Sequence, residues 1–259
     1  MKGILSSLIS QPATGLSLWF MAIFTIVFAC GAVYGYGYMK HYGGRPLRNT
    51  LHWINYAVAY ISMMLLCVVD NSVAFLVSWE IMALSSFFLV IYESEKPETI
   101  KAGINFFIQS HISVVLLTAG FMMIAAKTGS YSFNAIPRYC AENNGMAAFL
   151  LLFAGFAVKA GFVPFHTWLP YAHPAAPAHI SGVMSGVIIK IGIFGILRMI
   201  TWFSIDFVTA GGIILAVSAI SGLYGVMMAI MQHNLKKLLA LRHYWSAPCF
   251  LVEKRSNIR

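Results

Sequence analysis

Long apolar stretches recur along almost the whole of this 259-residue chain. An α-helix needs about 20 mostly apolar residues to cross the hydrocarbon core of a bilayer. Seven stretches meet this requirement, and they cover residues 16–38, 51–69, 72–92, 102–126, 146–168, 178–203 and 207–231. Backbone polar groups in lipid must be satisfied within the segment, so each stretch is expected to be helical. The sequence therefore predicts an all-α, polytopic membrane helix bundle with about seven transmembrane helices.

The composition excludes several classes of protein. Apolar residues make up 59% of the chain and charged residues 10%, whereas soluble domains carry about 25% charged residues. The net charge of +9 fits cytoplasmic loops rich in lysine and arginine, so no nucleic-acid partner is expected. The four cysteines have no CxxC spacing, and no dinucleotide, Walker or HExxH motif occurs. We therefore expect no bound cofactor and no metal site.

The distribution of basic residues predicts the orientation of the chain. When the connecting segments are sorted by side, eleven basic residues lie on one side: Lys40, Arg45, Arg48, Lys96, Lys101, Lys236, Lys237, Arg242, Lys254, Arg255 and Arg259. Four lie on the other side: Lys2, Lys127, Arg138 and Arg198. The side richer in lysine and arginine is normally cytoplasmic. We predict a multi-pass protein of the inner (plasma) membrane with its N-terminus outside.

Three charged residues interrupt the apolar stretches. Glu80 lies in 72–92, Lys159 in 146–168 and Lys190 near the middle of 178–203. A charge at bilayer depth costs at least ~2.5–3.5 kcal/mol, so such residues usually face a bundle interior and mark an ion pathway. The alternative is a structural pair that locks helices together. Three such residues in three spans favour conduction.

Proton conduction needs groups that both bind and release a proton. Desolvation favours proton release from a lysine and proton retention by a glutamate, whereas a neighbouring opposite charge counteracts both effects. Glu80 and Lys159 are therefore a candidate switchable couple, with Lys190 as a proton acceptor through water. Gly161 and Pro164 follow Lys159 closely and predict a broken helix of the kind found in transporters. The alternative is an ordinary proline kink.

Histidines extend this set of titratable groups. His166, His173 and His179 surround the connection between the two lysine-bearing spans, and histidine titrates near neutral pH. A solvated loop histidine is the alternative interpretation. His111 lies inside the fourth span and is either a relay member or a hydrogen-bonding partner of a neighbouring helix. We list Glu80, Lys159, Lys190, His173, His166 and His111 as candidate proton-pathway residues.

Three segments of the sequence resemble landmarks of one membrane-protein family. The longest covers residues 156–198 and reads FAVKAGFVPFHTWLPYAHPAAPAHISGVMSGVIIKIGIFGILR, and the others read SWEIMALSSFFLVIYE and QHNLKKLLA. They resemble the proton-translocating antiporter-like subunits of respiratory complex I, of multi-subunit cation/proton antiporters and of membrane-bound NiFe hydrogenases. The form AHPAAPAHISGVMSG is most similar to the hydrogenase-4 and formate hydrogenlyase subunit. Complex I members usually carry an aspartate at the position of Tyr171.

The resemblance implies roles for individual residues. Glu80 matches the glutamate of the fifth family helix, Lys159 the lysine of the broken seventh helix, and Lys190 the lysine of the eighth. His173 matches the histidine of the loop between those two helices. The family pattern implies a proton half-channel of five helices, repeated in inverted form by the next five. It places redox centres in partner subunits and no cofactor in this one.

The chain departs from the family pattern beyond its third landmark. Residues 1–240 are expected to form the first repeat of the antiporter-like domain, and residues 241–259 a divergent basic tail that is not a spanning segment. The second repeat is missing from this sequence. A truncated reading frame or a split gene would account for it.

The leading functional prediction is a proton-translocating membrane subunit of a hydrogenase-4/formate hydrogenlyase or NADH:quinone oxidoreductase-type complex. Such a subunit would itself be non-catalytic, and its partners would be other membrane subunits and peripheral iron–sulfur and NiFe subunits. The second hypothesis is a cation/proton antiporter subunit without redox partners. The third is a truncated, non-conducting remnant or scaffold.

Overall fold

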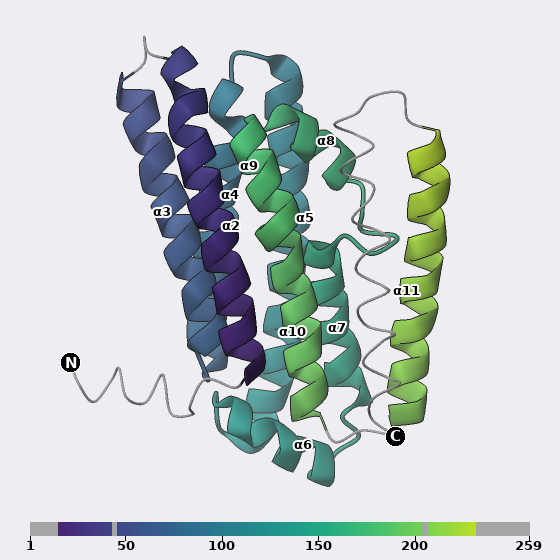
Figure 1. Cartoon of the computed structure of the whole chain (residues 1–259). Coiled ribbons are helices and arrows are strands. Elements are labelled where there is room, and N and C mark those ends of the chain that lie inside the picture. Colours follow the sequence, from purple (N-terminus) through teal and green to yellow (C-terminus); the bar gives the residue numbers. More distant parts are fainter. Residues whose placement is uncertain (1–14, 43–45, 204–206, 232–259) are drawn as a thin grey trace, which may run out of the picture.

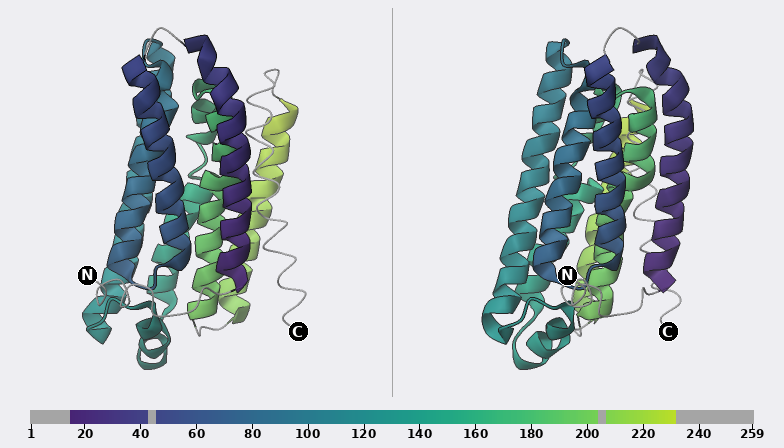
Figure 2. Two further views of the ribbon diagram at one scale, coloured as in Figure 1. Left: turned by 60° about the vertical axis from the view of Figure 1, so that its left-hand side comes forward. Right: turned by 90° about the vertical axis from the view of Figure 1, so that its left-hand side faces the viewer.

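The computed structural model describes residues 15–42, 46–203 and 207–231. The long helices run along a common axis, and the short helix α6 lies across one end of the bundle (Figures 1 and 2). The chain passes through α2 (Gly15–Met39), α3 (Pro46–Val68), α4 (Ser72–Val90), α5 (Pro97–Thr128), α6 (Ile136–Glu142), α7 (Met146–Ala160), α8 (Leu169–Ala175), α9 (Ala178–Val183), α10 (Ile189–Trp202) and α11 (Phe207–Ile230). Short turns complete the path: 3-10 turns at Lys40–Tyr42, Ile91–Glu93 and Phe133–Ala135, and a π-helical segment at Met184–Ile188.

Every predicted span contains a helix. Six helical segments of the described chain are long and apolar enough to cross a membrane, and α7 is a shorter apolar helix. The predicted span 146–168 is helical only as far as Ala160, because Gly161 adopts a left-handed φ of 74° and ends α7. The predicted polytopic helical bundle with one broken helix is therefore confirmed.

Local sequence signals explain where the other helices begin and end. The side chain of Asn71 caps α4 by accepting hydrogen bonds from the amides of Val73 and Ala74 at 2.9 and 3.3 Å. Pro97 occupies the first turn of α5, where its missing N–H costs nothing, and Gly129 ends that helix with a φ of 68°. The turn between α3 and α4 is only three residues long, so these helices form a tight antiparallel hairpin.

The helix formed by α9, the π segment and α10 lies at the centre of the bundle. In the most apolar 18-residue stretch of this helix 72% of the residues are buried, whereas in the corresponding stretch of α2 only 22% are buried. α7 and α10 approach closely, since a Cβ atom on Gly192 would lie 2.7 Å from the amide nitrogen of Ala160 and 2.8 Å from the carbonyl oxygen of Phe156. Only glycine allows this approach, which brings the backbone of α10 against the end of α7 next to Lys159.

A buried ion pair joins the α3–α4 hairpin to α10. The guanidinium of Arg198 donates to Asp70 at 2.7 Å and to the carbonyl oxygen of Leu66 at 3.1 Å. The rings of Phe133 and Trp202 cover the guanidinium at 5.4 and 5.1 Å. This arrangement gives a buried charge both a counter-ion and hydrogen-bond partners, which is the condition for tolerating it.

Candidate proton site at the break of α7

The break after α7 exposes backbone groups that side chains then satisfy. The indole N–H of Trp168 donates to the carbonyl oxygen of Val158 at 3.1 Å. The amide of Val163 donates to the hydroxyl of Ser221 on α11 at 3.0 Å. The chain resumes its helical path at Leu169 in α8. The break is therefore a defined segment held from both sides, and it lies directly after the last turn of α7, which carries Lys159.

Lys159 is enclosed by protein. Its relative exposure is 1%, which is exceptional for a lysine. The ammonium donates a hydrogen bond to the hydroxyl of Ser110 on α5 at 3.0 Å and lies 4.4 Å from the centre of the Phe106 ring. A buried ammonium with one hydroxyl and one aromatic face as neighbours is only partly compensated for its lost hydration. This environment is suited to releasing a proton.

Glu80 forms an ion pair with His111 rather than with Lys159. One carboxylate oxygen lies 3.0 Å from Nε2 of His111, while Nδ1 of that ring lies 3.0 Å from the carbonyl oxygen of Phe107. Both ring nitrogens of His111 therefore face acceptor oxygens. The other carboxylate oxygen of Glu80 is buried and has no hydrogen-bond partner among the described residues.

In this structure Glu80 contacts His111 and Lys159 contacts Ser110, so the switchable Glu80–Lys159 couple stays a prediction. Ser110 contacts Lys159, and the next residue, His111, contacts Glu80. Two consecutive residues of α5 therefore connect the lysine of α7 with the glutamate of α4. From the sequence alone the role of His111 is open and Ser110 is not predicted. A run of polar residues within an apolar span, NFFIQSH, was the available signal.

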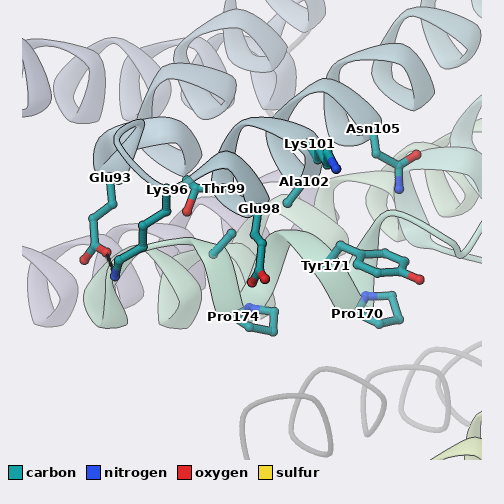
Figure 3. A pocket seen from close by; sticks show the side chains of 11 residues that line it. Glu93, Lys96, Glu98, Thr99, Lys101, Ala102, Asn105, Pro170, Tyr171 and Pro174 are labelled. Atoms are coloured by element: carbon teal, nitrogen blue, oxygen red, sulfur yellow. Dashed lines mark hydrogen bonds and ion pairs between the residues drawn. The ribbon is translucent and has the colours of Figure 1, made fainter.

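Polar residues continue along α5 towards one end of the bundle. The side-chain amides of Asn105 and Gln109 donate to Thr167 in the break, at 3.3 Å to its carbonyl and 3.2 Å to its hydroxyl. Asn105 also lines an open pocket of about 610 Å³ between α5 and α8. Figure 3 shows charged side chains along this pocket, with Glu98 pointing towards Pro174 and with Tyr171 on the same side as Asn105. These residues form a polar track along α5, and Gln109 directly precedes Ser110, the hydrogen-bond partner of Lys159.

Lys190 lies beyond a local change in helix geometry. The five residues Met184–Ile188 form a π-helical segment directly before α10, and Lys190 is the second residue of α10 and is half-buried. Single π turns inside helices occur frequently at functional sites. The sequence does not predict this π-helical segment, because its residues form no distinctive pattern.

The two remaining predicted histidines take part in separate contacts. His173 is buried, and its Nδ1 lies 2.9 Å from the hydroxyl of Ser181, a contact that joins α8 to α9. His166 is half-buried in the break, and its ring lies 4.6 Å from the ring of Tyr224 on α11. The structure therefore places His173 beside the central helix and His166 beside α11.

Comparison with known proteins assigns the chain to a family. Residues 70–242 match the family described as the transmembrane domain of NADH:quinone oxidoreductases and Mrp antiporters. The chain belongs to this family. Among its members, hydrogenase-4 component B of Escherichia coli is 38% identical over 234 residues, which cover 87% of this chain and 34% of that protein. The chain thus spans about a third of the length of this relative.

Solved structures show the same antiporter-like fold. One is a Mrp complex from Dietzia, with a TM-score of 0.73 at 19% identity over 92% of this chain and 43% of the matched chain. Another is respiratory complex I from Thermus thermophilus, with a TM-score of 0.71 at 20% identity over 90% of this chain and 50% of the matched chain. The family match and the apolar helices make the chain a multi-pass membrane protein of the antiporter-like family, and the solved structures that share its fold are parts of multi-subunit complexes.

Proposed function

We propose that this chain carries a proton half-channel of a membrane subunit that couples electron transfer to proton movement. The assembly would be of the hydrogenase-4/formate hydrogenlyase or NADH:quinone oxidoreductase type. The observation that carries this proposal is the fully buried Lys159 at the break of α7, hydrogen-bonded to Ser110. An ionisable residue at membrane depth marks an ion pathway unless it has a structural partner of opposite charge, and within the described chain no carboxylate forms an ion pair with Lys159.

The proposed pathway follows the polar track of α5. Protons enter at the pocket between α5 and α8, pass the Asn105–Thr167 and Gln109–Thr167 contacts through water, and reach Lys159. The Glu80–His111 pair, connected to Lys159 through consecutive residues of α5, stores the neighbouring proton. Lys190 and His173 would take up the proton on the far side of Lys159. In this scheme the electrostatic balance between Glu80 and Lys159 sets when the lysine releases its proton.

The partners that this function requires lie outside the chain. We propose that residues 1–240 form one repeat of the half-channel, that residues 241–259 lie outside it, and that a second repeat supplies the exit. Iron–sulfur and NiFe subunits would carry the electrons, because the chemistry proposed for this subunit is proton movement alone. The similarity to hydrogenase-4 component B favours a hydrogenase-type assembly over a complex I-type one.

Proton uptake by inverted membrane vesicles tests this function. Vesicles that contain the assembled complex should acidify on addition of the electron donor, as followed with a pH-sensitive dye. An inhibitor of the electron-transfer subunits should abolish the signal. If instead sodium dissipates an imposed proton gradient without any electron donor, the chain belongs to a cation/proton antiporter. If neither response occurs, the chain is a non-conducting scaffold.

Reporter fusions test the proposed orientation in the inner membrane. With the N-terminus outside, α2 crosses the membrane once, so a fusion after Arg48 should report a cytoplasmic location. The helices α3, α4 and α5 then cross it three more times, so a fusion after Tyr131 should report an external location. Alkaline phosphatase and green fluorescent protein fusions at each point provide reciprocal readouts. The reverse order at these two points would contradict the orientation inferred from the basic residues.

A further inference from the structure

A pair of buried histidines lies outside the site at the α7 break. His52 in the second turn of α3 and His179 in α9 are 127 residues apart in the sequence, and their Nε2 atoms lie 2.8 Å from each other. Each residue is 3% exposed. The two rings meet edge to face with their centres 4.9 Å apart. This is a hydrogen bond between two titratable groups in the interior of a membrane bundle.

The proton count of this pair leaves two nitrogens without partners. Between neutral rings, one Nε2 donates and the other accepts, so one outer Nδ1 carries a proton and the other carries a lone pair. Both Nδ1 atoms are buried and neither has a hydrogen-bond partner among the described residues. An unsatisfied buried polar atom costs about 1–3 kcal/mol. Native structures therefore rarely retain two such atoms side by side unless a water molecule or a proton binds to them.

The surroundings hold the rings in place without neutralising them. A Cβ atom on Gly35 of α2 would lie 2.8 Å from Cδ2 of His179, so the glycine makes room for that imidazole. The rings packed around the pair are Tyr38, Trp53, Tyr56 and Tyr92. The hydroxyl of Tyr56 donates to the carbonyl of Phe28 at 2.7 Å and that of Tyr92 to the side chain of Asn49. The hydroxyls of Tyr56 and Tyr92 are therefore directed at groups other than the two histidines.

The pair joins α3, near a charged end of the bundle, to the first turn of the central helix. His52 is one turn from Arg48, which forms an ion pair with Glu95 at 3.4 Å. His179 is the second residue of α9, the helix that continues through the π segment to Lys190. Figure 1 shows α9 beside α2 at the end of the bundle where α3 begins, away from α11 and the break of α7.

We propose that the His52–His179 pair is a proton-exchanging site that feeds the central helix by a second entry, separate from the pocket between α5 and α8. The proton binds the bare outer Nδ1, so that the pair holds three N–H protons on four nitrogens. The inner proton then shifts between the two Nε2 atoms, and a proton leaves from either Nδ1 to water. Only N–H bonds form and break, and one proton enters for each that leaves. The proposal rests on the proposed proton-conducting function.

Glutamine substitutions separate proton exchange from structural support. In His52→Gln and His179→Gln, the side-chain amide reaches towards the remaining imidazole and can preserve one hydrogen bond, but it does not titrate. In vesicles that contain the whole complex, each variant should lower the rate of proton uptake by at least about tenfold, since a positioned proton-transfer group typically contributes about a hundredfold or more. Tyr56→Phe is the matched control: it removes a buried hydroxyl beside the pair, leaves both imidazoles and should keep the wild-type rate.

The outcomes distinguish this proposal from the function on which it rests. If the glutamine variants pump at the wild-type rate while Lys159→Met is inactive, the pair is a structural hydrogen bond and only the second entry is wrong. If Lys159→Met also pumps normally, the proposed function itself fails.

A measurement on the unmodified chain applies even if the variants do not assemble. In lipid vesicles with ¹⁵N-labelled histidine, nuclear magnetic resonance should detect an N–H···N pair whose outer nitrogens exchange with deuterium oxide. Outer nitrogens that remain protected from exchange would overturn the proposal.

Discussion

Replacing Lys159 with methionine is expected to abolish proton uptake driven by electron transfer while the complex still assembles. Methionine has a similar length and is apolar, so it fills the buried space beside Ser110 and Phe106. It removes the only group at this position that can carry a proton. Lys159→Arg should also fail, because a guanidinium does not release its proton in a protein. Dye-based proton uptake in inverted vesicles and co-purification of the partner subunits measure the two effects separately.

Lys127→Met is the matched control for this experiment. Lys127 is exposed in the last turn of α5, so its replacement removes the same charge from the same chain without touching the interior. Ser110→Ala provides a graded test, since it keeps the ammonium of Lys159 and deletes only its hydrogen-bond partner; the uptake rate should fall without vanishing. Normal stoichiometry of protons to electrons in Lys159→Met would mean that this lysine is structural and that the proposed pathway is wrong.

Replacing Arg198 with methionine should lower the free energy of unfolding more than any other substitution proposed for this chain. The substitution leaves the carboxylate of Asp70 buried without its counter-ion and the carbonyl oxygen of Leu66 without its donor. Removing one partner of a buried ion pair typically costs about 3–5 kcal/mol. Unfolding of the purified chain in mild detergent, followed by loss of helical signal on heating or in denaturant, measures this cost. The α3–α4 hairpin should detach from α10 first, because Asp70 lies in its turn.

A double substitution and a surface control make this prediction specific. Arg198→Met combined with Asp70→Leu removes both charges and should recover most of the stability, as replacing a buried ion pair with apolar residues is often neutral. Arg138→Gln breaks the exposed 2.8 Å pair with Glu142 in α6 and should have no measurable effect. If Arg198→Met is as stable as this control, the buried bridge does not hold the hairpin to α10.

The sequence alone determined the class of fold and the position of the break. Apolar length fixes the number of spans because a bilayer has a fixed thickness, and each helix can be recognised without knowing its neighbours. Gly161 acts on its own backbone, so the end of α7 at Ala160 follows from local conformational preference. The charged positions Glu80, Lys159 and Lys190 were likewise visible as interruptions of apolar runs.

Only the tertiary structure decided which of these groups meet. The contacts of Lys159 with Ser110, of Arg198 with Asp70 and of His52 with His179 join residues 49, 128 and 127 positions apart. Whether two such side chains touch depends on the rotation of each helix about its axis and on which helices are neighbours. In spans that are apolar on all sides, the residue pattern sets neither quantity. Packing sets both, through close approaches such as that of Gly192 to the end of α7.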